Sequence, residues 1–171
     1  MKLPGPPIPQ SHLQPGELFV TQEPQWVITL LGSCVAVTMF SARFRLAAIC
    51  HATLPKPHSK GTIGLNENEQ FRYLSLVIPA MTRRFSELGL QPQEVEVKIF
   101  GGGNVIDLGG DPHNDHSIGD ANVAKARKLL ESARFQIKAQ SVGGNRGCKI
   151  LFNTGNGQVL HKLLSRGGNK V

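Results

Sequence analysis

Residues 26–51, WVITLLGSCVAVTMFSARFRLAAICH, decide the fold of this chain. Three runs in this stretch are rich in β-branched, apolar and aromatic residues and are predicted strands: Trp26–Leu31, Val35–Phe40 and Phe44–His51. Gly32-Ser33 bends the chain after the first run, and Ser41-Ala42-Arg43 is a hairpin turn between the other two. Antiparallel pairing across this hairpin would bring Cys34 and His51 to the same end of the sheet.

Cys34 and His51 are therefore the candidate nucleophile and base. A free cysteine has a pKa of about 8.5, so it needs a nearby base to react at neutral pH, and imidazole is the usual partner. The residues after Cys34 favour a strand, so a helix dipole gives little help and His51 must supply most of the activation. The backbone N–H of Cys34, together with that of Ser33 or Gly32, is a candidate oxyanion hole. The alternative is a buried cysteine that packs as a small hydrophobe beside a structural histidine.

The remainder of the chain predicts an α+β domain with two main helices and about eight strands. Apolar residues at helical spacing predict helices over Glu69–Leu88, where Pro79 should kink or shorten the helix, and over Asn122–Phe135. The other predicted strands are Leu18–Val20, Val95–Ile99, Gln136–Val142, Lys149–Asn153 and Gln158–Leu164. Residues 1–16 form a proline-rich extended N-terminal segment, and residues 17–171 form a single domain.

Positive charge gathers in the last third of the chain. The net charge is +7, and residues 121–171 hold ten of the nineteen Lys and Arg residues but one acidic residue, Glu131. Such a region should attract an anionic partner. Because no DNA-binding or RNA-binding motif is recognisable, an acidic protein surface is favoured over nucleic acid.

Cysteine usage and hydropathy indicate a cytoplasmic protein that does not insert into a membrane. The three cysteines, Cys34, Cys50 and Cys148, are an odd number and include no CxxC pair, which argues against a disulfide framework or a zinc ribbon. The longest apolar stretch, Trp26–Phe40, is shorter than the roughly 20 residues of a spanning helix. The N-terminus has no apolar segment typical of a secretory signal.

Two further patterns suggest ligand sites but favour simpler interpretations. Asp111, His113, Asp115 and His116 could hold a divalent metal, but their spacing matches no compact motif, so a polar loop is the better interpretation. Gly101-Gly102-Gly103-Asn104 and Gly143–Gly147 lack the lysine and the spacing of phosphate-binding loops. They predict close backbone approaches rather than nucleotide binding.

Five separated motifs, in order, resemble those of the chemoreceptor glutamine deamidase family, CheD, over about residues 17 to 164. They are Leu31-Gly32-Ser33-Cys34-Val35-Ala36-Val37; His51-Ala52-Thr53-Leu54-Pro55; Lys98-Ile99-Phe100-Gly101-Gly102-Gly103; Ile118-Gly119-Asp120-Ala121-Asn122-Val123; and Val142-Gly143-Gly144-Asn145-Arg146-Gly147 with Thr154-Gly155. The resemblance implies a layered α/β/β sandwich, with the two helices packed on mostly antiparallel or mixed sheets.

The resemblance also implies the activity, which is hydrolysis of glutamine carboxamides on methyl-accepting chemotaxis receptors to glutamate. Cys34 and His51 match the family's nucleophile and base, including their spacing, and the reaction needs no metal or cofactor. The partners implied are receptor cytoplasmic domains and, as in some members, a CheC-type phosphatase. Two alternatives stay open, namely a binding module that regulates such a phosphatase with little catalysis, and a different cysteine hydrolase such as a peptidase.

The chain departs from the family pattern at two positions. Some members carry, six residues before the cysteine, a threonine that orients the histidine, and here that position is Ile28. Thr29 is one residue later, and neighbouring side chains of a strand point to opposite faces. Thr29 is thus a candidate orienting residue that needs a bulge to shift its register, and otherwise a backbone carbonyl must hold the imidazole. Cys148 stands where members usually carry a basic residue.

Overall fold

The structure is a computed structural model that describes residues 8–58, 64–105 and 117–165. Its strands are β1 (Gln10–His12), β2 (Leu18–Thr21), β3 (Trp26–Leu31), β4 (Val35–Ser41), β5 (Leu46–Ala52), β6 (Glu96–Gly101), β7 (Ile137–Val142), β8 (Cys148–Asn153) and β9 (Val159–Leu163). Its helices are α1 (Glu67–Gln70), α2 (Leu74–Ser86) and α3 (Ile118–Ser132), with a 3₁₀ turn at Pro92–Glu94.

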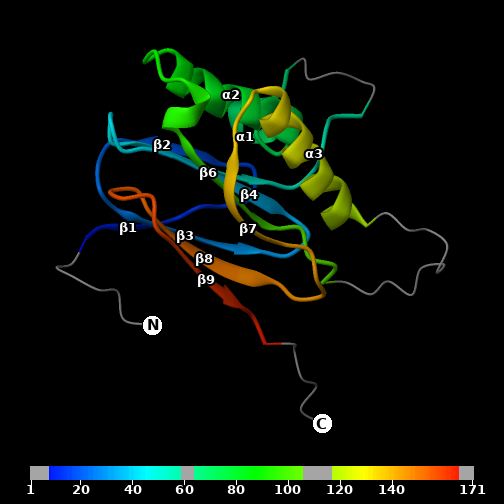
Figure 1. Cartoon of the computed structure of the whole chain (residues 1–171). Helices are drawn as coiled ribbons and strands as arrows, with labels where there is room; N and C mark the ends of the chain where they lie inside the picture. Colours follow the sequence, from blue (N-terminus) through cyan, green and yellow to red (C-terminus); the bar gives the residue numbers. More distant parts are fainter. Residues whose placement is uncertain (1–7, 59–63, 106–116, 166–171) are drawn as a thin grey trace, which may run out of the picture.

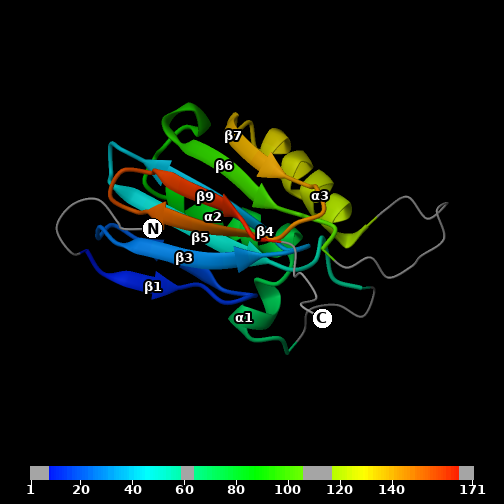
Figure 2. The same cartoon turned by 90° about the horizontal axis from the view of Figure 1, so that it is seen from below.

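These elements stack in three layers (Figure 1). The outer sheet has the strand order β1-β3-β8-β9, and the central sheet has the order β2-β5-β4-β6-β7. Helices α2 and α3 lie on the face of the central sheet that points away from the outer sheet, as both views show (Figures 1 and 2). The expected layered α+β architecture is therefore confirmed.

The chain crosses from one sheet to the other at the Gly-Ser bend. Strand β3 belongs to the outer sheet and β4 to the central sheet, so residues 32–34 bridge the two layers. Strand β4 then pairs antiparallel with β5, from Val35 opposite Ala52 to Ser41 opposite Leu46. The predicted hairpin is confirmed, and the strand before it lies in a different layer.

Side-chain alternation along β4 and β5 feeds two separate cores. On β5, Ala48 and Cys50 pack under the helices, whereas Ala47 and Ile49 pack between the sheets. Because side chains alternate with a period of two, His51 continues the inter-sheet series. The residue is 2% exposed. The fold thus places this histidine inside the layer between the two sheets.

The predicted helices differ from the observed ones at their starts. The helix expected over Glu69–Leu88 is divided into α1 and α2, because Leu54 forms a β-bridge with Tyr73 and interrupts the helical hydrogen bonds. Pro79 does not end α2, which continues to Ser86. Helix α3 begins four residues before the expected Asn122, because the Ser117 hydroxyl caps it by accepting from the Asp120 N–H at 3.1 Å.

Strand β1 was not expected from the proline-rich start of the chain. It pairs in parallel with β3, with His12 opposite Ile28, and it leads into Leu13, which is buried. This pairing matters for the site because it places the backbone carbonyl of Leu13 next to β3. Residues 1–7 of the predicted N-terminal segment lie outside the described residues.

Candidate active site

Cys34 lies at the crossover between the sheets, held by the glycine run that follows β6. The Gly102 N–H donates to the Cys34 carbonyl at 2.7 Å, and the Gly103 N–H donates to the Gly32 carbonyl at 2.8 Å. A Cβ atom at Gly101, where φ is +99°, would stand 2.2 Å from the Cys34 carbonyl oxygen. The close backbone approach predicted for this glycine run is therefore confirmed.

The strand register places Cys34 and His51 on the same face of the hairpin. Ala36 is opposite His51 and Val35 is opposite Ala52, so the next position, Cys34, falls diagonally across from His51. The Cys34 side chain is partly buried and packs against the core between the sheets, which is the side that His51 faces. The pairing inferred from the hairpin thus brings the two side chains to one end of the inter-sheet layer.

Thr29 reaches His51 from the opposite sheet. Its Oγ1 lies 2.8 Å from His51 Nδ1 and also 2.8 Å from the Leu13 carbonyl oxygen, to which it donates. Since the hydroxyl has one hydrogen and gives it to the carbonyl, it accepts from Nδ1–H. The imidazole is then the Nδ1–H tautomer, and Nε2 carries the lone pair.

This contact requires no β-bulge. Strand β3 pairs with β8 in continuous register from Trp26 opposite Asn153 to Leu31 opposite Cys148. Ile28 packs on the outer face of its sheet, so Thr29 points inward. The expectation that Thr29 needs a register shift is wrong. The chain crosses between the sheets at residues 32–34, so the direction of a side chain on β3 is not tied to that of Cys34 by strand alternation. The backbone carbonyl of Leu13 contributes as well, because it accepts a hydrogen bond from the Thr29 hydroxyl and so fixes its orientation.

Nε2 of His51 is buried and has no hydrogen-bond partner among the residues that the structure describes. An unpaired buried nitrogen costs free energy, on the order of 1–3 kcal/mol. Such an atom is also free to accept a proton from a neighbouring group. No hydrogen bond joins Nε2 to Sγ of Cys34 among the described residues, but the strand register places both side chains on one face, so Nε2 is the ring nitrogen left to take a proton from the thiol.

The electrostatics of the resting site favour an uncharged pair. Burial raises the pKa of the Cys34 thiol, and this outweighs the opposite effects of its own backbone N–H and of the Arg72 charge. Burial lowers the pKa of His51 to about 4, against the opposing influence of the Leu13 carbonyl and Glu17. At neutral pH the pair is thus a thiol and a neutral imidazole, whereas the sequence alone suggested a thiolate.

Alkylation by iodoacetamide should reveal this resting state. Because burial raises the pKa of Cys34 above that of a free cysteine, the thiolate fraction and the alkylation rate should be low at pH 7 and still rise above pH 9. Cys50 and Cys148 are buried, and burial raises the pKa of their thiols to about 12 and about 11, so they should stay unlabelled in the folded protein. A rate plateau reached below pH 7 would instead indicate a preformed thiolate–imidazolium pair.

The N–H groups of Ser33 and Cys34 have no acceptor on any other described residue, whereas the carbonyls beside them are all occupied. The Ser33 carbonyl accepts from Nδ2 of Asn122, on α3, at 3.0 Å. Sequence reasoning placed Asn122 in a family motif but gave it no role. Because this residue is distant in sequence from Cys34, spacing alone offered no signal for their contact.

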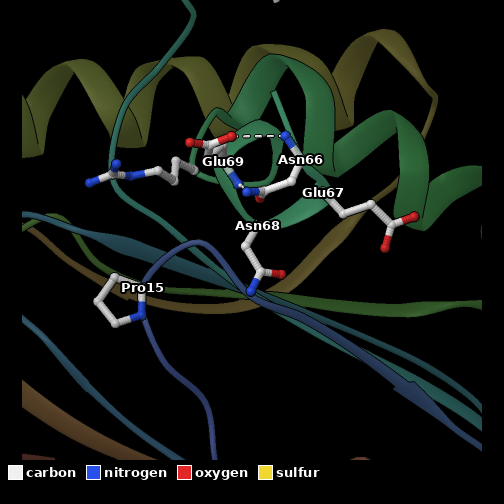
Figure 3. Close-up of a pocket in the computed structure, with 6 residues that line it drawn as sticks. Pro15, Asn66, Glu67, Asn68 and Glu69 are labelled. Atoms are coloured by element: carbon white, nitrogen blue, oxygen red, sulfur yellow. Dashed lines mark hydrogen bonds between the residues drawn. The ribbon is translucent and has the colours of Figure 1, made fainter. Parts of the chain in front are cut away.

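Two pockets lie beside the segment that follows β1. One, of about 480 Å³, lies between Pro15 and the first turn of α1, and Figure 3 shows Asn66, Glu67 and Asn68 around it. It also includes Arg72, whose charge acts on Cys34. The second, of about 310 Å³, is lined by Leu13, Thr29, His51 and Lys149 among others. Of the two pockets, the second is the one lined by a residue of the pair, His51, so it opens beside the imidazole.

Other predicted features fall outside this site. Asp111, His113, Asp115 and His116 lie outside the described residues. Within residues 8–58, 64–105 and 117–165, no group of three or more potential ligands could hold a metal ion. In the same ranges, no helix is both long and apolar enough to cross a membrane. Cys148 is buried opposite Leu31 in the outer sheet, where it packs as a hydrophobe.

Comparison with known proteins identifies close relatives. The family described as CheD chemotactic sensory transduction matches residues 54–163. A probable chemoreceptor glutamine deamidase CheD 2 of Geobacter sulfurreducens is 38% identical over 161 residues, or 94% of each chain. A protein of Oleidesulfovibrio alaskensis with the name probable chemoreceptor glutamine deamidase CheD is 40% identical, covering 96% of this chain and 77% of its own. A protein of Maridesulfovibrio salexigens with the same name is 35% identical, covering 93% of this chain and 94% of its own.

Proposed function

The chain belongs to the CheD family, and from this premise we propose that it is a protein-glutamine deamidase. It would convert specific glutamine side chains of methyl-accepting chemotaxis receptors to glutamate and release ammonia. The observation that carries this proposal is the pairing of Thr29 with Nδ1 of His51, which leaves Nε2 unpaired on the face shared with Cys34.

The first half of the reaction forms a thioester. The Cys34 Sγ attacks the carboxamide carbon while Nε2 of His51 takes the thiol proton. Because the resting pair is neutral, the proton moves when the substrate binds rather than beforehand. The N–H groups of Ser33 and Cys34 bind the developing oxyanion. His51 then gives its proton to the leaving nitrogen, the C–N bond breaks, and ammonia departs.

The second half hydrolyses the thioester. His51 removes a proton from water, the oxygen attacks the acyl carbon, and the C–S bond breaks as the proton returns to Sγ of Cys34. The products are glutamate and the original thiol. Throughout both halves, Thr29 accepts from Nδ1–H whether the ring is neutral or charged, so one hydroxyl keeps the ring oriented.

The substrate surface would be acidic. Arg72 acts on Cys34 from the rim of one pocket, and Lys149, from the cationic last third of the chain, lines the other. Cations at the rim favour approach of an anionic receptor domain. We also infer a cytoplasmic location, since all three cysteines are free, and a CheC-type phosphatase as a partner on the family resemblance.

Mass spectrometry of a receptor cytoplasmic fragment incubated with the protein tests the function. A deamidase converts particular glutamines to glutamates, releases ammonia in equal amount and leaves the fragment uncut. Cleaved fragments would point to a peptidase. An unchanged fragment, with the protein folded, would contradict the proposal and favour a binding module.

The role of Thr29 predicts a moderate loss of activity in Thr29→Val. Valine keeps the branched shape but leaves Nδ1–H of His51 unpaired, which costs about 1–3 kcal/mol and lowers kcat roughly 10- to 100-fold. The ¹⁵N spectrum of the imidazole should also show a larger share of the Nε2–H tautomer. Thr38→Val, the same change at another buried threonine, is the control. If kcat and the tautomer ratio were unchanged in Thr29→Val, Thr29 would not orient the His51 ring.

A further inference from the structure

Asn122 is the buried polar residue that ties the nucleophile segment to the segment after His51. It lies on α3, it is 0% exposed, and its Nδ2 donates to the carbonyls of Ser33 and Thr53, each at 3.0 Å. Its Oδ1 is buried without a partner among the described residues. Burying an amide is costly unless it is hydrogen-bonded. The Asn122 side chain uses both amide hydrogens on carbonyls of two segments that are distant in sequence, so it joins these segments.

Three successive carbonyls around the nucleophile are held by separate donors. Gly32 O accepts from Gly103 N–H, Ser33 O from Asn122, and Cys34 O from Gly102 N–H. These donors lie together, because a Cβ added at Gly102 would touch both Val123 and the Gly119 carbonyl in the first turns of α3. The Ser33 carbonyl is thus held by α3 itself, and the carbonyls on either side of it by the glycine run that packs beside α3.

This arrangement sets the direction of the opposing N–H groups. All described peptide bonds are trans, and in a trans peptide the C=O and N–H point in opposite directions. When Asn122 holds the Ser33 carbonyl toward α3, the Cys34 N–H points away from α3. The helix packs on the far face of the central sheet, whereas Cys34 packs on the inter-sheet side. The N–H therefore faces the side on which the thiol lies.

We propose that Asn122 is a positioning residue that fixes the Ser33–Cys34 peptide as a preformed oxyanion hole and locks it to the strand end that carries His51. This inference deepens the proposed deamidase activity and rests on it. Because the donor is oriented before the substrate arrives, the site has no reorganisation to undergo when the oxyanion forms. The second bond, to Thr53, keeps that donor in fixed relation to the base.

The test separates oxyanion stabilisation from thiol reactivity. In Asn122→Asp, a carboxylate of the same shape replaces the amide donor and repels both carbonyls. We expect kcat for ammonia release from a receptor fragment to fall about 100-fold, with KM unchanged. The limiting rate at which iodoacetamide alkylates the fully deprotonated Cys34 at high pH should equal that of the parent, because alkylation forms no oxyanion.

Two further variants keep the test decisive. Asn122→Ser, which retains one shorter donor, should show the same pattern with a smaller loss, and it carries the comparison if the aspartate variant does not fold. Leu130→Val trims a buried side chain of the same helix without touching the nucleophile segment. If Leu130→Val lowers Tm as much as the Asn122 variants do, it should still keep the parental kcat.

Several outcomes would overturn the positioning role. These are parental kcat in Asn122→Asp or Asn122→Ser, a fall in alkylation rate as large as the fall in kcat, or an equal loss of kcat in Leu130→Val. Failure of the function itself looks different. A folded parent protein that releases no ammonia from receptor fragments refutes the deamidase proposal, whereas an active parent with an equally active Asn122→Asp refutes the positioning role alone.

Discussion

Replacing Cys34 with alanine is expected to abolish ammonia release from receptor fragments while leaving the fold intact. In the proposed reaction the thiol supplies the atom that bonds to the substrate carbon, and no other described cysteine is both accessible and near a base. Loss of a catalytic nucleophile typically lowers kcat by at least about 10⁴-fold. The side chain is small and partly exposed, so its truncation to Cβ should change Tm little.

A matched substitution at Cys148 gives the control. Cys148→Ala removes the same atom from a buried position in the outer sheet, so it should lower stability slightly and leave kcat at the parental value. Ammonia release from Cys34→Ala at the parental rate would refute the nucleophile assignment. Loss of activity in both variants, together with loss of the folded state, would indicate a stability effect.

Replacing His51 with glutamine should have the second-largest effect. Glutamine can still hydrogen-bond to Thr29, but it cannot carry a proton between the thiol, the leaving nitrogen and water. Removal of general acid–base catalysis costs about 10²–10⁴-fold in kcat. Since the base acts in both halves of the reaction, neither thioester formation nor its hydrolysis should be spared. Alkylation of Cys34 above pH 9 should persist, because hydroxide then removes the proton.

His161→Gln is the control for this variant. His161 also sits between the sheets, where its ring stacks on Phe100 at a centroid distance of 6.0 Å and its Nε2 lies 3.3 Å from Ser141 Oγ. Among the described residues it forms no hydrogen bond with Cys34 or Thr29, so its substitution should leave kcat unchanged. If His51→Gln retained parental kcat across the pH range, the base assignment would be wrong.

Much of the fold was predictable because it depends on local patterns. Alternating apolar residues and turn residues identified the strands from Leu18 onward, with ends within a few residues of those observed. Strand β1 and the start of α3 were missed for a physical reason. The first three-residue strand is stabilised by its partner β3, and the start of α3 is set by a single capping serine, so neither carries a periodic signal.

The assignment of strands to sheets was beyond local reasoning. Residues 26–31 and 35–41 look alike and follow one another, yet they lie in different layers. This crossover is what lets Thr29 face His51 from the opposite sheet. Counting back from Cys34 treats residues 28–34 as one continuous strand, and this count places Thr29 on the wrong face.

The sequence by itself determined the family and the candidate nucleophile and base. Their types, their spacing around one hairpin and five ordered motifs are properties that pairing rules and resemblance can use directly. Only the tertiary structure decided what orients and tunes them. Leu13, Thr29 and Asn122 reach the pair from β1's end, the opposite sheet and a helix, and hydrogen bonds between distant segments leave no periodic trace in a sequence. Burial by those same layers, rather than residue type, sets the neutral resting state of the pair.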